Sequence, residues 1–495
     1  MRPRPSSFPS SSFPSGNLVA LVVVLSVMLD GALAGTSSAQ DELGVPDRRV
    51  QRRELKELRE QHADAYRNRS REAMADLADD LRDASETLEP AARYVHLEEA
   101  RTLAVAAGEV KLAFEIAESL ATAFVVDRFE LLGTTAKDLA RGVASRDELV
   151  EVGRRTLKLV TEAAEAERYE GGARIASVVE SIARKAGDRA RRERAMHFQG
   201  QLAHLARLHA AMSEARRELL NTPDAPDPHL AVALYLAVAR CDLEKSIPHL
   251  ARVADERLRR VAEAERKPPV EPAAKLALAR SWEELIDAEH ALSENRQLLP
   301  YRWHFLARAI RDRALYWYRE ARDDAGPVER VEIDARIAAW GATEPSNVVG
   351  GDGGGRFDDA TRGPGLLIGV RYSIAGSGPT AVIGSIKPMF RTPHGEVLGP
   401  IHRGRSRGAV DLIARPGYAV GGVRAAGTNR LETLRLIFMK VNGPGLDPAD
   451  SYLSEPIGGS ARAVEETIHW GGVPAIGIHG REGADIDALG LLYQR

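Results

Sequence analysis

The sequence predicts two structural parts, an α-helical solenoid followed by an all-β domain, and three observations support this prediction. From just after Pro46 to about Ala342, apolar residues recur at helical spacing between charged ones. Residues 345–355 (PSNVVGGDGGG) then form the clearest break in composition. Beyond that break, short apolar runs lie between Gly, Pro and Asn residues, which is typical of strands joined by turns. A chain of 495 residues is long enough for two or three domains.

The N-terminus has the pattern of an export signal. Two early arginines precede an apolar run over residues 18–29, and residues 32–34 (ALA) form a small-x-small cleavage pattern. The run is shorter than the roughly 20 residues that a spanning helix needs, which favours cleavage over a permanent membrane anchor. We expect a signal peptide over residues 1–34, with cleavage after Ala39 as the alternative, and a leader over 35–48. The mature protein would then be periplasmic, in the cell envelope or extracellular.

Charge and cysteine content exclude several classes of partner and reaction. The net charge of −3, with both signs interspersed, gives no dominant basic surface and so predicts no nucleic-acid partner. The sequence has a single cysteine, Cys241, so no intramolecular disulfide can form. Because Cys241 lies in an apolar pattern, we expect a buried, unreactive thiol rather than a nucleophile.

The helical part is predicted over residues 49–342. Its first element is a long amphipathic helix over 49–88 that ends near Pro90, because apolar residues recur there at helical steps. The later helices, of about 12–20 residues each, are separated by short breaks at glycines and prolines. Residues 188–194 (DRARRER) form either a basic docking patch or, by default, a solvated helix face.

A degenerate repeat lies inside this part. Val110, Tyr169 and Leu243 each follow a turn, and small or apolar residues come at +3, +4 and +7, which lets paired helices approach closely. Residues 223–254 look like a tetratricopeptide repeat, with a polar-proline entry, a helix, a short turn and a second helix. The three starting residues are unevenly spaced, so we predict a tetratricopeptide-like solenoid. Such a solenoid is expected to bind a protein partner.

The all-β part repeats three times. Residues 366–390, 418–440 and 475–493 each contain a short apolar strand with glycine, a turn region and a second apolar strand. Three antiparallel sheets packed around a pseudo-threefold axis would satisfy this pattern.

Two glycine-containing stretches in this part carry the functional prediction. Residues 350–359 (GGDGGGRFDD) precede the first apolar run, and residues 483–487 (GADID) join the last two strands. A turn that points backbone N–H groups and one carboxylate at the same spot can hold a polyhydroxylated ligand without a metal. Together the two stretches resemble the jacalin-related lectins, in which a glycine-rich strand and a G-x-x-x-D loop form one saccharide pocket. The resemblance implies a β-prism over residues 354–495, after a glycine-rich linker over 343–353.

The resemblance also assigns the carbohydrate-binding residues. Gly354 matches the glycine that opens the first strand, and Gly483 opens the loop. Ala484 and Asp485 match positions whose backbone N–H groups face the sugar, and Asp487 matches the carboxylate that accepts hydrogen bonds from two adjacent hydroxyls. The family often has aromatic residues where this chain has Ala484 and Asp485, so an apolar wall is missing.

Two alternatives remain open for this loop. The second carboxylate, Asp485, adds like-charge repulsion beside Asp487, which could favour a cation or a cationic partner. In the other alternative Gly483 only makes a tight turn that Asp487 caps, and the prism binds no sugar.

A second string of the same spacing, residues 443–447 (GPGLD), follows the second strand of its repeat rather than joining two strands. We therefore expect a plain proline turn there. The nearby acidic residues match no calcium-binding loop.

The sequence contains no recognisable catalytic or metal-binding motif. It has no H-E-x-x-H, G-x-S-x-G or phosphate-binding glycine loop, and its histidines lack partners at metal-site spacing. We therefore predict an exported, non-catalytic carbohydrate-binding protein with a helical protein-interaction domain and no cofactor or metal. The alternative is a structural adaptor in which both parts bind proteins and no sugar.

Overall fold

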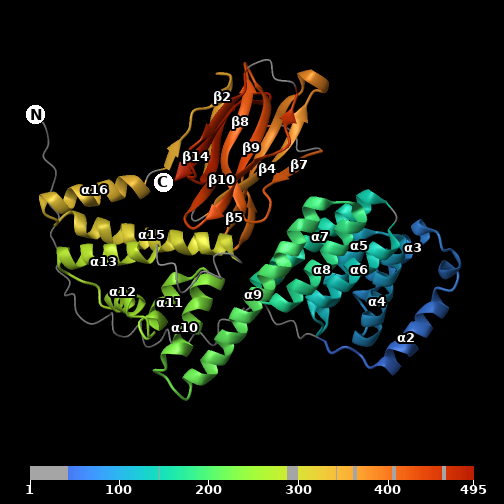
Figure 1. The fold of residues 1–495 in the computed structure, drawn as a ribbon. Helices are drawn as coiled ribbons and strands as arrows, with labels where there is room; N and C mark the ends of the chain where they lie inside the picture. The colour runs from blue at the N-terminus through green and yellow to red at the C-terminus, as the bar shows by residue number, and fades with distance from the viewer. Residues whose placement is uncertain are drawn as a thin grey trace, which may run out of the picture.

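The computed structural model describes residues 43–143, 145–286, 299–341, 343–360, 365–403, 408–459 and 464–494. Helices occupy the described chain up to residue 341 and strands occupy it from residue 343 onward (Figure 1). The predicted fold class, a helical part followed by an all-β part, is confirmed. The expected signal peptide and most of the leader lie outside the described residues. No helix in the described ranges combines the length and the apolar character needed to cross a membrane.

Helices of both groups contribute to one extended apolar core. The long helix α9 runs from the first group to the second (Figure 1). The first group comprises α2 (Arg48–Gln61), η1 (Ala65–Arg67), α3 (Arg71–Ser85), α4 (Pro90–Ala107), α5 (Val110–Ala123), α6 (Arg128–Gly142), α7 (Arg146–Glu165), α8 (Tyr169–Ala186) and α9 (Arg189–Leu219). The second group comprises α10 (Pro226–Leu234), the π-helix η2 (Tyr235–Ala239), α11 (Leu243–Leu250), α12 (Glu256–Arg266), α13 (Pro272–Ile286), α15 (Pro300–Arg322) and α16 (Pro327–Gly341).

The prediction of one long helix over residues 49–88 is wrong. The chain forms α2, η1 and α3 instead, because local hydrogen bonds stop the first helix and start the next. The Ser70 side chain caps α3 by accepting from the backbone N–H of Ala73 at 3.2 Å, and Asn68 accepts from Ser70 at 3.0 Å. Both α2 and α3 pack against α4, so the apolar spacing continues across the break and hides it.

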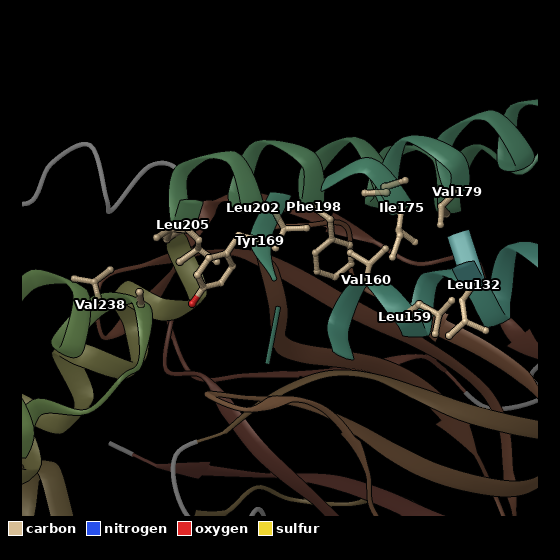
Figure 2. Packing of buried hydrophobic residues seen from close by; sticks show 14 of the residues in the cluster. Leu132, Leu159, Val160, Tyr169, Ile175, Val179, Phe198, Leu202, Leu205 and Val238 are labelled. Carbon is tan, nitrogen blue, oxygen red and sulfur yellow. The ribbon is translucent and has the colours of Figure 1, made fainter. Parts of the chain in front are cut away.

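The predicted repeat marks the starts of helices. Val110, Tyr169 and Leu243 are the first residues of α5, α8 and α11. Small residues at the repeat positions allow close packing: a Cβ atom on Gly172 would lie 3.1 Å from a methyl group of Leu202. Figure 2 shows side chains of α7, α8 and α9 gathered in this cluster. The tetratricopeptide type of the solenoid stays a prediction.

The strands pair antiparallel, and the longest of them form three hairpins. In chain order they are β1 (Thr343–Pro345), β2 (Val349–Gly350), β3 (Gly355–Ala360), β4 (Leu366–Ala375), β5 (Val382–Thr392), β6 (Gly395–Leu398), β7 (Val410–Ile413), β8 (Tyr418–Gly427), β9 (Leu431–Asn442), β10 (Gly445–Leu453), β11 (Ile457–Gly458), β12 (Glu466–His469), β13 (Ala475–Glu482) and β14 (Ile486–Gln494).

Three antiparallel sheets are built on these hairpins, as the β-prism prediction requires. The strand orders are β1-β14-β13-β3 with β2 beside β14, β10-β9-β8-β12 with β11 beside β9, and β6-β5-β4-β7. The pairs β4/β5, β8/β9 and β13/β14 are the three strand pairs predicted from the sequence, and each sheet packs on the other two around one apolar core. The segment 343–353, expected as a linker, contains β1 and β2, and both pair with β14.

The strand region packs against the helices through a third apolar cluster and several polar contacts. The Tyr301 hydroxyl on α15 donates to the carbonyl of Tyr418 at 2.8 Å. Glu396 in β6 pairs with Arg391 at 2.5 Å and with Arg194 of α9. Burial would raise the pKa of Glu396, but these two arginines outweigh burial and lower the pKa. The default prediction of a solvated face over residues 188–194 is therefore wrong for Arg194, whose side chain is largely buried in this interface.

Candidate functional site

The turn between β13 and β14 holds the predicted loop. Residues 483–485 connect the two strands, and the backbone N–H of Gly483 donates to the carbonyl of Asp485 at 2.9 Å, which closes the turn. Ala484 is exposed at its tip. The register between the two strands shifts next to the turn, between Arg481 and Glu482.

The glycine-rich stretch arrives beside this turn because β3 pairs antiparallel with β13. In that register Gly355 lies opposite Glu482. The Arg481 side chain donates to the carbonyl oxygens of Gly353 at 2.7 Å and Gly354 at 3.0 Å, and so ties the stretch to β13. Gly354 has φ +62°, and a Cβ atom there would overlap the carbonyl oxygen of Glu482. Only glycine fits this position without strain.

Asp487 is the second residue of β14 and is only 7% exposed. A Cβ atom would lie 2.6 Å from its Oδ2 atom if placed on Gly354, 2.7 Å if placed on Gly483 and 3.2 Å if placed on Gly353. The three glycines therefore let the backbone lie close against the carboxylate, and we call this arrangement the glycine cradle. Within the described residues, the carboxylate accepts no hydrogen bond and forms no ion pair.

A buried carboxylate without partners is unusual, because buried polar side chains are normally hydrogen-bonded. Both oxygens of Asp487 keep their capacity to accept hydrogen bonds from a ligand. The arrangement can therefore receive hydroxyl groups. The described residues contain no group of three or more His, Cys, Asp or Glu side chains able to hold a metal ion.

Unlike Asp487, Asp485 has an ion-pair partner. Its Oδ2 atom lies 2.6 Å from Nη1 of Arg430, in the turn between β8 and β9. This turn also packs on the glycine stretch, since a Cβ atom on Gly351 would lie 2.5 Å from the carbonyl oxygen of Asn429. The carboxylate expected to repel Asp487 is thus paired with a cation from another hairpin.

A second group of side chains joins the two strands that flank the glycine cradle, β3 and β13, to His402. His402 stacks on Phe357 of β3, with ring centroids 3.9 Å apart and an interplanar angle of 19°. Its Nε2 atom pairs with Asp359 of β3, and its Nδ1 atom lies 3.6 Å from the carboxylate of Glu482. These contacts hold β3 and β13 to the segment that carries His402.

The structure therefore brings Gly354, Gly483 and Asp487 together, exposes Ala484 at the tip and turns the Asp485 side chain toward Arg430. Sequence reasoning missed Arg430, His402 and Arg481. For Arg430 a signal existed: the predicted threefold repeat contains equivalent hairpins, so the turn of one hairpin is a candidate neighbour for the turn of another. His402 and Arg481 had no such signal.

The second G-x-x-x-D string has a different environment. Residues 443–444 connect β9 to β10, so the prediction that this string joins no two strands is wrong, although it does form a turn. The carbonyl oxygen of Gly443 accepts from Nδ1 of His304 on α15 at 3.0 Å. The Asp447 carboxylate accepts from the backbone N–H of Ala449 at 2.9 Å and thus caps its own turn.

Comparisons with known proteins find similarity in solved structures. No protein-family model matches the sequence, and no curated protein matches it. Wild-type Malaysian banana lectin is 18% identical over 31% of this chain and 99% of that chain, with a TM-score of 0.24. A mannose-specific jacalin-related lectin from Morus nigra, in complex with mannose, is 18% identical over 31% of this chain and 95% of that chain, with a TM-score of 0.24. AcmJRL, a mannose-binding jacalin-related lectin from Ananas comosus, is 16% identical over 31% and 99%, with a TM-score of 0.24. The matched part of this chain is the strand region, residues 343–494.

Proposed function

We propose that the strand region binds carbohydrate in the glycine cradle without a metal ion. The observation that carries this proposal is the carboxylate of Asp487, which is more than nine-tenths buried, has no partner among the described residues and lies close against three glycines. A carboxylate with two free oxygens can accept hydrogen bonds from two neighbouring hydroxyls of a sugar ring.

The loop residues complete the proposed pocket. We expect the backbone N–H groups of Ala484 and Asp485 to face the sugar, because that of Gly483 already donates to the carbonyl of Asp485. Gly354 lets the glycine-rich stretch lie close to the carboxylate. Ala484 offers no aromatic face, so hydrogen bonds carry most of the affinity. We expect a monosaccharide to bind with a dissociation constant of about 1 mM. The protein would act by binding, without turnover.

The helical part is proposed to bind a protein partner. Supporting this role, a groove of about 920 Å³ runs along α6 and α8, with Phe129, Ile175 and Val178 among its apolar lining. Four cationic side chains and one acidic side chain, Glu130, also line it: the cations are Lys137, Arg141, Arg174 and Lys185. The same groove supports the alternative function, an adaptor whose two parts both bind proteins and no sugar. Export to the periplasm, cell envelope or exterior remains part of the proposal.

A glycan array probed with the full chain tests the proposal. The expected result is binding to a defined set of glycans that survives EDTA and is lost in Asp487→Ala. Binding that needs calcium would contradict the metal-free site. Absence of binding in both proteins, with unchanged thermal unfolding, would favour the adaptor.

A further inference from the structure

We propose that Arg430 is a positioning residue of the glycine cradle: by pairing with Asp485 it keeps Asp487 available for hydroxyl groups and sets the site for neutral rather than cationic saccharides. This inference rests on the proposed carbohydrate function. It concerns a residue outside both glycine-containing stretches, contributed by the β8/β9 hairpin.

The geometry places two carboxylates at one end of β14. Asp487 is in β14 and Asp485 is two residues before it, in the turn that leads into the strand. The Asp485 side chain is only 13% exposed, whereas that of Arg430 is 53% exposed. A carboxylate so far withdrawn from water needs a partner, and Arg430 supplies it at 2.6 Å.

Neighbouring cations do not replace Arg430. The guanidinium of Arg481 donates to the carbonyl oxygens of Gly353 and Gly354. Arg356 is exposed on β3, in register with Arg481. In the described part of the chain, Arg430 is the cation that forms an ion pair with Asp485.

The pairing decides the charge that a ligand meets. With Asp485 neutralised by Arg430, Asp487 is the carboxylate of the cradle that has no partner among the described residues, and its oxygens can accept hydrogen bonds from hydroxyl groups. Without Arg430, two uncompensated carboxylates would lie a short distance apart. Their combined field attracts a cation, which an uncharged sugar would have to displace before it reached Asp487.

A double-mutant cycle in the full chain tests the inference. The variants are Arg430→Ala, Asp485→Ala and the double variant, with Arg430→Lys as the conservative change. Calorimetric titrations use a panel of neutral methyl hexosides and, separately, glucosamine. Arg424→Ala is the matched control, because Arg424 also lies in this hairpin and pairs with a carboxylate, Glu465, at 2.9 Å.

Arg430→Ala should weaken neutral hexoside binding about 10-fold and should bind glucosamine more tightly than the wild type does. Removing Asp485 as well should restore neutral binding to within about 2-fold of wild type, while Arg430→Lys and Arg424→Ala stay within about 3-fold. A simple loss of fold cannot give this rescue, so the cycle separates positioning from stability.

Two results would overturn the inference. One is wild-type binding that disappears in Asp487→Ala but does not change in Arg430→Ala. The other is a double variant that binds as weakly as Arg430→Ala. If the wild type binds no saccharide at all, the proposed function fails and the inference fails with it.

Discussion

The two G-x-x-x-D turns of this chain share their spacing but differ in what surrounds the aspartate. At residues 483–487 the carboxylate of Asp487 is buried, unpaired among the described residues and bordered by glycines. At residues 443–447 the carboxylate of Asp447 accepts a hydrogen bond from Ala449, and the turn is fixed to α15 through His304. A spacing alone therefore does not make a site. The neighbouring strand makes the difference, because β3 brings Gly354 beside the turn at residues 483–487.

The largest effect is expected at Gly354. In Gly354→Ala, the new Cβ would overlap the carbonyl of Glu482, lie 2.6 Å from Oδ2 of Asp487 and require a residue with φ +62°. We expect sugar binding to fall more than 30-fold and the free energy of unfolding to fall by about 2 kcal/mol. Calorimetric titration and thermal unfolding measure both.

Gly355→Ala is the matched control, since a Cβ atom there meets nothing within 4 Å. It should bind like the wild type. Equal losses in the two variants would show that the glycine stretch is generally fragile and that the cradle has no special role.

The stability of the turn at residues 443–447 should depend on pH through His304. Burial, with Arg308 and Arg311 nearby, lowers the pKa of His304 to about 3, although its hydrogen bond to Gly443 opposes the shift. The folded pKa lies below the unfolded value, so this stabilisation is complete above about pH 6.5 and is lost as the pH falls toward 3. Between pH 7 and pH 5 the contribution of His304 should fall by about 2 kcal/mol.

Urea denaturation of the wild type and His304→Asn at both pH values measures this loss. Asparagine retains an N–H donor for the Gly443 carbonyl but does not titrate, so the variant should lose about 2 kcal/mol less than the wild type. Identical pH dependence in the two proteins would argue against the buried His304. Saccharide binding at pH 7 should be the same in both.

A smaller effect on saccharide binding, a gain rather than a loss, is expected at Ala484, the tip of the turn at residues 483–487. Ala484→Trp adds an aromatic face beside the cradle and should tighten saccharide binding about 5-fold, which is close to 1 kcal/mol. The same change at Ala449, which is exposed in the segment after Asp447, should leave binding unaltered. A gain from Ala449→Trp, or none from Ala484→Trp, would place the sugar elsewhere.

Local patterns in the sequence predicted much of this molecule. The three strand pairs follow from alternating apolar runs and glycine turns, and the meeting of Gly354, Gly483 and Asp487 follows from the resemblance. The pairing of Asp485 with Arg430 was predictable only as far as the hairpins, because the threefold repeat makes their turns candidate neighbours. The two residues are 55 positions apart, and no spacing rule selects this arginine.

The predictions for the helical part were wrong where local capping or contacts with the strand region override the apolar spacing. The break between α2 and α3 arises from the Asn68 and Ser70 caps, while apolar spacing runs on because both helices pack against α4. Arg194 belongs to a charged helix start, yet it pairs with Glu396 of the distant strand region. A helical pattern in one chain segment carries no information on which solvent-facing positions another domain will cover.

Whether Asp487 binds carbohydrate is tested most directly by comparing Asp487→Asn with Asp447→Asn in the full chain, by calorimetric titration of a glycan that the wild type binds. Each change removes a charge from the aspartate of a G-x-x-x-D turn and keeps its shape. If the glycine cradle is the carbohydrate site, binding should be at least 30-fold weaker in Asp487→Asn and unchanged in Asp447→Asn. Equal affinity in the two variants would contradict the glycine cradle as the carbohydrate site.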